Sequence, residues 1–451
     1  MSRRVVVVGG GIAGLTAAHR LVTLDSDLDV DLFERSDRSG GNIKTTEFAG
    51  HPVDEAADAF LTRVPWAVDL CRELGLDDRL VAPSGLPASI WHEDALHPIP
   101  TPNVLGVPLE PEALAASGLV SGAAVDSLRH DRAGNGRPVD HQDSIGTLIR
   151  GRLGDEILER LVDPLIGGIY AAHPDDVSLV TTVPQFAAAA DAPSFTRALA
   201  EAQDRAGTAT EPVFATPRGG VGQLVDALEH RLGDRIHLNA VVESVSATST
   251  GLAIEVDGRT QAADACVIAT PAETASRLLA SIPAAATLAA VDAVSVSIIT
   301  LAFDREAVDG PLESSGFLVS RSSGLTMTAC SVASAKWPHL GHDQVVLRVS
   351  VGRAGDDAIA AASDATLIDV IRRDLATTLG IERPPTDMRI SRWPHSFPRY
   401  RPGHLERMAA VTSALAGSGI AIAGASTTGI GIPTCVKSGD AAARRTYELL
   451  R

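Results

Sequence analysis

The chain has 451 residues, of which 45% are hydrophobic and 21% are charged, and its formal net charge is −17. This length and composition indicate two or three globular domains and exclude a chain that is disordered throughout. The net negative charge argues against a nucleic-acid partner, because binding to phosphates requires a basic surface.

The first predicted element is a βαβ unit that binds a dinucleotide. A β-branched run over 5–8 predicts a strand, and a helix is predicted over 15–21. Between them Gly9, Gly11 and Gly14 follow the spacing G-x-G-x-x-G, which permits a sharp turn, close approach to a pyrophosphate and close packing of helix on strand. The helix N-terminus offers free N–H groups and the positive end of its dipole to the phosphates.

A second predicted strand, over 30–33, ends at Glu34. The acid follows the last glycine at about the 20-residue distance expected of a carboxylate that binds ribose hydroxyls, and its charge argues against NADP. The pair Gly40-Gly41 follows this strand. A plain NAD-binding unit does not require such a pair, whereas flavoproteins with two dinucleotide-binding domains use it to carry the chain back over the pyrophosphate and ribose, so the pattern favours FAD.

The middle of the chain is predicted to leave the nucleotide unit. A turn and helix start are predicted over 53–61, and an amphipathic helix over 65–74, with a proline at its first turn. A proline-rich connection over 83–111 follows. From about 110 to 205 the pattern is mostly helical, and we expect the helix over 144–161 to end before a break at 164–170.

The chain then returns twice to the nucleotide unit. The first return is predicted as a helix followed by three strands, over 223–232, 236–245, 252–256 and 266–269. The second is predicted as a strand, a glycine-rich loop and a final helix, over 419–424, 425–433 and 435–450. The N-terminus of that final helix would favour negative charge on a reduced flavin.

The segment 286–411, between the two returns, alternates apolar and polar residues, which predicts an antiparallel sheet, with one long helix over 364–379. The predicted fold class is therefore α/β, with a discontinuous Rossmann-like FAD-binding domain, an antiparallel-sheet substrate domain and an inserted helical domain. The predicted boundaries are 1–82, 212–285 and 412–451 for the first domain, 83–108 and 286–411 for the second, and 109–211 for the third.

The four cysteines, Cys71, Cys266, Cys330 and Cys435, are far apart and are expected to be reduced buried thiols. The sequence contains no metal-ligand cluster, so we expect no metal. The N-terminus leads directly into a strand, and no apolar run reaches the roughly 18 residues of a membrane span, so we expect a cytoplasmic protein without a signal peptide or transmembrane segment.

Several stretches together resemble the protoporphyrinogen/coproporphyrinogen oxidases among the amine-oxidase-type flavoproteins, and the soluble bacterial form in particular. They are GGGIAGLTAA (9–18), ERSDRSGGNIKT (34–45), PLIGGIYAAHPDDVSL (164–179), PRGGVGQLVDAL (217–228), RWPHSFPRYRPGHLERM (392–408) and 423–439. The resemblance covers essentially the whole chain. It implies non-covalent FAD and the oxygen-using, six-electron oxidation of coproporphyrinogen III to coproporphyrin III in haem biosynthesis, with release of H2O2. A ferrochelatase is then a candidate partner for product transfer.

The resemblance also implies roles for individual residues. Residues expected to contact FAD are Gly9, Gly10, Gly11, Ile12, Ala13, Gly14, Glu34, Arg35, Asn42, Ala56, Ala57, Asp58, Ala59, Val242, Trp393, Ala425, Ile430, Gly431 and Ile432. Gly168 and Tyr170 would line the substrate cavity. The family usually has Gly-Pro where this chain has Ala56-Ala57, so the shape of that loop is open. Trp393 either borders the flavin or belongs to the core.

The chemistry is centred on the flavin, so no catalytic side chain is assigned. His395 and His404 are candidates for a proton acceptor by residue type only, and a structural role is the simpler expectation for each. Arg63, Arg197, Arg205 and Arg218 are candidates for binding the propionates of the substrate.

Other functions remain open. Protoporphyrinogen IX oxidation is the nearest alternative. An amine oxidase would show an aromatic cage, and only Tyr170, Tyr400 and Tyr447 are available. A carotenoid-type desaturase would carry long apolar stretches, which the sequence lacks. A non-catalytic flavin- or NAD-binding sensor is the alternative outside the enzymes.

Overall fold

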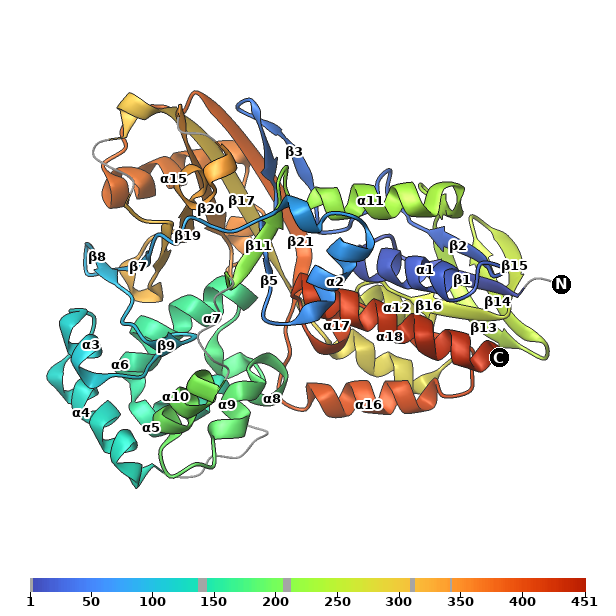
Figure 1. Ribbon diagram of the computed structural model, residues 1–451, viewed down its shortest axis with the longest axis horizontal. Coiled ribbons are helices and arrows are strands. Elements are labelled where there is room, and N and C mark those ends of the chain that lie inside the picture. The colour runs from blue at the N-terminus through green and yellow to red at the C-terminus, as the bar shows by residue number, and fades with distance from the viewer. Residues whose placement is uncertain (1–2, 137–143, 206–211, 309–312, 341–342) are drawn as a thin grey trace.

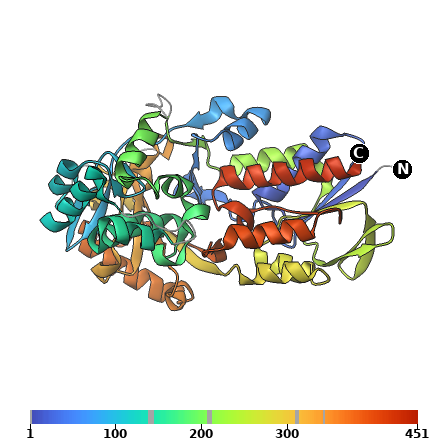
Figure 2. The same ribbon diagram turned by 90° about the horizontal axis from the view of Figure 1, so that it is seen from below.

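The computed structural model describes residues 3–136, 144–205, 212–308, 313–340 and 343–451. Figure 1 shows three lobes: a parallel sheet with its helices on the right, a large antiparallel sheet at the upper left, and a group of helices at the lower left. Figure 2, seen from below, places both chain ends in the lobe that holds the parallel sheet.

The parallel sheet has five strands. Their order is β12 (Ile236–His237), β2 (Asp29–Phe33), β1 (Arg4–Val8), β16 (Ala265–Ile268) and β22 (Ile420–Ile422). All four pairings are parallel. The strands come from three separate segments of the chain, which confirms the discontinuous Rossmann-like fold predicted from the sequence.

Both faces of this sheet are covered, which explains why β1 is a continuous valine run. Val5 and Val7 pack with α1 (Ile12–Leu24), α2 (Pro65–Glu73), α11 (Gly222–Leu232) and α18 (Ile432–Leu450). Val6 and Val8 pack on the opposite face against the meander β13 (Val242–Thr248), β14 (Gly251–Val256) and β15 (Arg259–Ala263), together with α12 (Ala272–Leu278) and α16 (His404–Ala414).

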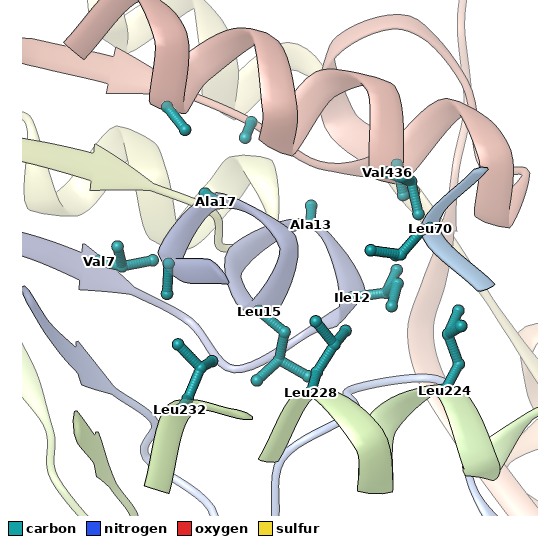
Figure 3. Packing of buried hydrophobic residues seen from close by; sticks show 14 of the residues in the cluster. Val7, Ile12, Ala13, Leu15, Ala17, Leu70, Leu224, Leu228, Leu232 and Val436 are labelled. Atoms are coloured by element: carbon teal, nitrogen blue, oxygen red, sulfur yellow. The ribbon is translucent and has the colours of Figure 1, made fainter. Parts of the chain in front are cut away.

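Helix α1 lies between α18 and α11 (Figure 3). Ile12, Leu15, Leu224 and Leu228 fill one side of this contact. The other side depends on a glycine: a Cβ on Gly439 of α18 would lie 2.2 Å from the Ala13 carbonyl oxygen. The two helices therefore approach more closely than any side chain at position 439 would allow.

The antiparallel sheet has seven strands. Their order is β21 (Asp387–Pro398), β17 (Ala293–Asp304), β20 (Gln344–Val351), β19 (Met327–Val332), β18 (Gly316–Val319), β7 (Ala88–His92) and β8 (Ala95–Pro98). The pair β18–β7 is parallel, and the other five pairs are antiparallel. One face packs against α15 (Asp364–Leu379), the long helix predicted there.

The third lobe is helical, as expected. Its main elements are α3 (Pro111–Ala116), α4 (Gly122–His130), α5 (Ile145–Leu153), α6 (Asp155–Ile157), α7 (Asp163–Tyr170), α8 (Leu179–Thr182), α9 (Pro184–Ala189) and α10 (Phe195–Arg205). They share one hydrophobic core. In the part of the chain that the structure describes, no helix has both the length and the apolar character that a bilayer crossing requires.

Three predicted elements are wrong in detail. The helix predicted over 144–161 ends at Leu153, because Gly154 adopts φ +91°. The break predicted at 164–170 is instead helix α7, in which Pro164 occupies the first turn and needs no N–H partner. The turn and helix start predicted over 53–61 form no helix: β4 (His51–Asp54) leads through a turn into β5 (Phe60–Leu61).

A fourth difference concerns the strand predicted over 236–245. It divides into β12 and β13, because Asn239 takes a left-handed φ of +54° and the chain bends there. Backbone hydrogen bonds hold the bend: the N–H of Asn239 donates to the Ser36 carbonyl and that of Ala240 to the Glu34 carbonyl. The bend therefore ties the end of β2 to the segment that leads into the meander.

Candidate active site

The first glycine turn is held by close backbone contacts. A Cβ on Gly9 would lie 2.7 Å from the Ala269 carbonyl oxygen, and Gly9 has φ +104°. A Cβ on Gly14 would lie 1.9 Å from the Gly9 carbonyl oxygen. Gly11 differs, since a Cβ there would meet nothing within 4 Å. Gly9 and Gly14 are thus required by packing, whereas Gly11 leaves open space beside the α1 N-terminus.

That N-terminus is suited to an anion. Gly11 is the N-cap of α1 and supplies no side-chain cap, and the first turn of the helix contains no acidic residue. The leading N–H groups, at Ile12 and Ala13, carry the positive end of the helix dipole. The arrangement can bind a pyrophosphate.

The second glycine pair packs directly on this turn. Gly40 pairs with Gly11 as an isolated parallel bridge, and its N–H donates to the Gly10 carbonyl at 2.7 Å. Arg38, which sequence reasoning missed, fixes the pair by donating to the carbonyl oxygens of Gly41 and Ile43. Its signal in the sequence was its place two residues before the Gly-Gly pair.

Glu34 lies at the carboxyl end of β2, beside the glycine turn. Its carboxylate accepts hydrogen bonds from the backbone N–H groups of Gly10 and Ser36, at 2.7 and 2.8 Å. Two backbone donors therefore orient the carboxylate, and its remaining lone pairs can accept hydrogen bonds from a ribose diol.

The loop that contains residues 56–59 is anchored to the antiparallel sheet by charge. The Asp58 carboxylate pairs with Lys336 at 2.9 Å and Arg348 at 3.1 Å, and it accepts a hydrogen bond from Trp337 Nε1 at 2.9 Å. Burial alone would raise the pKa of Asp58, but the two cations hold it well below its usual range. Arg348 also donates to the Ala56 carbonyl. The Asp58 side chain therefore holds the loop in place, and Ala56 and Ala57 are positioned by it.

The neighbouring Glu55 connects the same loop to β21. Its carboxylate pairs with Lys44 at 3.0 Å and accepts a hydrogen bond from Ser391 Oγ at 2.8 Å. Burial would raise the pKa of Glu55, but these partners lower it. The Glu55 carbonyl accepts a hydrogen bond from Trp393 Nε1 at 3.0 Å, so the indole ring has a fixed orientation.

The C-terminal loop, which leads into α18, is the second place where a helix begins beside the candidate site. Gly431 is the N-cap of α18 without a side-chain cap, so this second helix also presents a free N-terminus. The loop before it, which the sequence predicted to be irregular, contains one helical turn, α17 (Ala425–Thr428). The predicted contacts Ala425, Ile430 and Ile432 flank these two helix starts.

Two buried residues of the 400–404 segment hold this loop. Tyr400 Oη donates to the Ala425 carbonyl at 2.5 Å, and burial raises the Tyr400 pKa well above its usual value. His404 Nε2 lies 2.8 Å from the Thr427 carbonyl, so Nε2 carries the proton. Burial lowers the pKa of His404, which keeps the ring neutral. The sequence left His404 as a candidate proton acceptor by residue type only, with a structural role as the simpler expectation, and its geometry is that of a loop support.

The three lobes meet at one edge of the antiparallel sheet. Trp393 of β21 and Val294 and Val296 of β17 form a small cluster there with Ala171, which follows α7, and Ala56 packs against it. Gly168 and Tyr170, the predicted cavity residues, lie on the same helix α7. A Cβ on Gly168 would lie 3.0 Å from Leu318 Cδ2 of β18, so the glycine keeps α7 close to the sheet.

Other residues predicted from the sequence lie outside this junction. Arg35 and His395 are exposed, and His395 has a left-handed φ of +48°. Val242 is the first residue of the meander. It lies in the nucleotide lobe, where it packs in the same cluster as Phe33 at the end of β2. Asn42 is exposed and donates to the Ser396 carbonyl at 3.3 Å, which links the glycine pair to the end of β21.

The four arginines named for substrate carboxylates lie in three separate segments of the chain: before α2, on α10 and after β11 (Phe214–Pro217). Arg63, Arg197, Arg205 and Arg218 are all exposed. Arg197 and Arg205 both interact with Glu201 on α10. The Arg218 backbone N–H donates to the Arg79 carbonyl, and the Arg79 guanidinium donates to the Arg218 carbonyl. Surface positions are the usual environment of arginine, so residue type alone did not identify a binding site for carboxylates.

Comparisons with known proteins agree with this geometry. The sequence profile of the flavin-containing amine oxidoreductases matches residues 12–446. The chain is 32% identical over 456 residues to coproporphyrinogen III oxidase of Bacillus subtilis (strain 168), covering 98% of this chain and 97% of the relative. It is 35% identical over 457 residues to that of Mycobacterium tuberculosis (strain ATCC 25618 / H37Rv), covering 99% and 98%.

Solved structures show the same relationship. A crystal structure from Exiguobacterium sp. 255-15, assigned as a protoporphyrinogen oxidase, matches all of both chains with a TM-score of 0.89 and 29% identity. Cyclohexylamine oxidase from Brevibacterium oxydans IH-35A, at 19% identity, shares the fold with a TM-score of 0.72 over all of both chains. The protein is a flavoenzyme and an oxidase. The chain belongs to the flavin-containing amine oxidoreductases and, within them, to the protoporphyrinogen/coproporphyrinogen oxidases.

Proposed function

We propose that this protein oxidises coproporphyrinogen III to coproporphyrin III in haem biosynthesis, using non-covalently bound FAD and O2 and releasing H2O2. The observation that carries the proposal is the meeting of Ala56, Trp393 and Ala171 at one sheet edge. It brings together a loop of the nucleotide lobe, the antiparallel sheet and the helix that carries Gly168 and Tyr170. The names of the full-length bacterial relatives then favour coproporphyrinogen as the substrate.

The residues present fit FAD at both ends. The adenosine and pyrophosphate end would be held by the open face of Gly11, the α1 N-terminus and Glu34. Residues assigned to this end are Gly9, Gly10, Gly11, Ile12, Ala13, Gly14, Glu34, Arg35, Asn42 and Val242. The flavin end would lie where the anchored loop meets the α18 N-terminus. Residues assigned to it are Ala56, Ala57, Asp58, Ala59, Trp393, Ala425, Ile430, Gly431 and Ile432.

The cysteine nearest the flavin end supports non-covalent binding. Cys435 is buried in α18, and its Sγ lies 3.7 Å from the Gly429 carbonyl oxygen and 3.8 Å from that of Ile430. Burial raises the pKa of its thiol to about 12, so the thiol is neutral at physiological pH and is a poor nucleophile.

Bound flavin would accept two electrons as a hydride from the substrate in each of three cycles and pass them to O2, giving one H2O2 per cycle. The chain supplies position and surroundings. Trp393, fixed by its bond to Glu55, borders the junction, and the free N-terminus of α18 favours negative charge beside it. Tyr400 and His404 support the loop, and neither is assigned as a proton acceptor.

The test is anaerobic mixing with coproporphyrinogen III. Loss of the oxidised flavin absorbance, followed on admission of air by fluorescent coproporphyrin and peroxide, is expected. A protein whose flavin no porphyrinogen reduces would contradict the proposal and favour a sensor. Among enzymes, protoporphyrinogen IX oxidation is the alternative, since one plant relative at 25% identity is a chloroplastic protoporphyrinogen oxidase.

We propose further that the lobes correspond to domains with the boundaries given above: 1–82, 212–285 and 412–451 for FAD, 83–108 and 286–411 for substrate, and 109–211 for the helical insert. A cytoplasmic location and product transfer to a ferrochelatase belong to the same proposal. Co-fractionation of the native protein with cytoplasmic markers tests the first, and a binding titration with purified ferrochelatase tests the second.

A further inference from the structure

Two arginines lie close to the junction, where strands β18 and β20 of the antiparallel sheet end. Neither arginine was predicted from the sequence. Arg321 follows the last residue of β18 by two positions, and Arg353 follows the last residue of β20 by two positions. Both strands pair antiparallel with β19, so they run in the same direction and end at the same edge. Strand spacing places the two strand ends about 10 Å apart.

Arg321 is fixed by a buried acid of α7. Its Nε donates to both oxygens of Asp163, at 3.0 and 2.8 Å, and the Asp163 side chain is 4% exposed. Gly167 of α7 lies beside this pair, since a Cβ at that position would lie 3.6 Å from both Arg321 Nη2 and Asp163 Oδ1, an ordinary contact distance. The ion pair therefore joins the helix that carries Gly168 to the sheet and sets the position of one guanidinium.

Arg353 has no such partner. Its guanidinium makes no hydrogen bond or ion pair with any residue in the described ranges, although the side chain is half-buried. Burial and the nearby charge of Arg321 lower the pKa of Arg353, while Asp163 and Asp356 raise it. The Arg353 nitrogens are not among the buried polar atoms left without a partner in the described ranges, so the guanidinium keeps contact with solvent and is accessible to an acceptor on a ligand.

The backbone beside Arg353 is tied to the junction. The N–H of Ala354 donates to the Ala171 carbonyl at 2.7 Å, and Ala171 belongs to the cluster with Trp393. Arg353 is thus one residue from a direct contact with the segment that follows Tyr170. Asp163 is ion-paired with Arg321, and Asp356 acts on Arg353 by its charge without an ion pair, so the Arg353 guanidinium is left without a hydrogen-bonded acceptor among the described residues on this side of the junction.

We propose that Arg353, oriented beside the Arg321–Asp163 pair, binds a carboxylate of the substrate as it lies against α7 and the sheet edge. The inference rests on the proposed function, because a porphyrinogen carries propionates on the rim of an apolar ring. A carboxylate would give Arg353 the acceptor that the described chain lacks, in a bidentate geometry that a lysine cannot match. Arg353 is a binding residue here, and Arg321 is a positioning residue.

The test is equilibrium binding of coproporphyrin III to the flavin-loaded protein, followed by porphyrin fluorescence, with its uncharged tetramethyl ester measured in the same detergent buffer. Arg353→Gln is expected to weaken binding of the acid roughly tenfold or more and to leave the ester unchanged. Arg372→Gln, on the exposed side of α15, is the matched control and should bind both like the wild type.

Two further measurements separate a binding role from a structural one. Arg353→Lys keeps the charge without the planar fork and is expected to fall between the wild type and Arg353→Gln. In turnover, Arg353→Gln should raise KM for coproporphyrinogen III more than it lowers kcat. Flavin content and the midpoint of thermal unfolding identify a variant that has lost its fold. If Arg353→Gln has lost its fold, the binding affinity of Arg353→Lys decides between a binding role and a structural role.

The result that would overturn the inference is unchanged affinity for coproporphyrin III in Arg353→Gln, or equal loss of affinity for the acid and the ester. Failure of the proposed function is distinguishable, because it is read from the wild type: its flavin would not be reduced by coproporphyrinogen III, whatever the effect of the substitutions on binding.

Discussion

The hydroxyl of Tyr400 donates a 2.5 Å hydrogen bond to the carbonyl of Ala425, 25 residues further along the chain. Tyr400 is fully buried, with its ring at an edge-to-face angle to Tyr170 and close to His404. The contact joins the segment before α16 to the loop that precedes α18. It therefore determines where the proposed flavin loop lies relative to the helical lobe.

Tyr400→Phe removes the donor and leaves the ring. The Ala425 carbonyl loses its partner, so the free energy of unfolding is expected to fall by about 1–3 kcal/mol, and flavin should dissociate more readily. Urea unfolding and the flavin-to-protein absorbance ratio measure the two effects. Tyr447→Phe on α18, where no hydrogen bond of the hydroxyl is present among the described residues, should change neither. Equal effects of the two substitutions would contradict this role.

Two glycine-to-alanine substitutions should change the free energy of unfolding in opposite directions. Gly439→Ala places a Cβ 2.2 Å from the Ala13 backbone, which forces α1 and α18 apart, so stability should fall by about 1–3 kcal/mol. Gly151→Ala in α5 meets nothing within 4 Å and should raise stability by about 0.5–1 kcal/mol through helix propensity. Thermal unfolding at one pH measures both. A stabilised Gly439→Ala protein would show that the close helix contact is not required.

Asp54 predicts a pH dependence of stability. Burial raises the pKa of Asp54 from 3.8 to about 6. The hydrogen bonds that its carboxylate accepts from Thr45 and from the Val221 N–H lower the pKa, but by less than burial raises it. Between pH 4 and 6 the folded protein therefore binds a proton that the unfolded chain does not. The stability contributed by that proton is complete below pH 4 and is lost as pH rises through 6.

Asp54→Asn isolates this contribution, since the amide oxygen can accept both hydrogen bonds without a charge. Relative to the wild type, the variant should gain up to about 3 kcal/mol in the free energy of unfolding at pH 8 and little at pH 4. Urea unfolding at several pH values gives the difference, with Asp37→Asn on the exposed surface as control. Parallel pH curves for wild type and Asp54→Asn would rule out the raised pKa.

Glu34→Arg tests the nucleotide end. The substitution removes the acceptor of two backbone N–H groups and of the expected ribose hydroxyls, and it places a cation there. Flavin affinity should fall at least about tenfold, in line with the loss of one or more charged hydrogen bonds. Glu47→Arg, an exposed position on β3 (Thr45–Phe48), makes the same charge change away from the turn. Retention of flavin by Glu34→Arg would mean that the acid does not contact the ribose.

The nucleotide unit could be predicted because its signals are local. The spacing of Gly9, Gly11 and Gly14 and the position of Glu34 depend on a single βαβ unit, and the structure has each of them where the pattern requires. The same holds for α15, whose apolar period is regular over its whole length. Local periodicity failed at Gly154 and Pro164, where a positive φ and a tolerated first-turn proline decide the helix boundaries.

The junction could not be predicted, because its contacts join distant parts of the chain. Arg348 and Asp58 meet across 290 positions, and their pairing leaves no spacing signal. Exposure also depends on tertiary packing: Arg63 and Arg218, chosen by residue type, are at the surface, whereas Arg321 and Arg353 reach the sheet edge through strand order. Likewise, the shape of the loop at Ala56-Ala57, where the family usually has Gly-Pro, could not be predicted, because the loop is fixed by a hydrogen bond from the distant Arg348.

The proposed substrate is tested by a side-by-side comparison of coproporphyrinogen III and protoporphyrinogen IX in air, with porphyrin and peroxide measured together. A higher kcat/KM is expected for coproporphyrinogen III, with three H2O2 released per coproporphyrin formed. Equal or faster turnover of protoporphyrinogen IX, or a flavin that neither porphyrinogen reduces, would contradict this expectation.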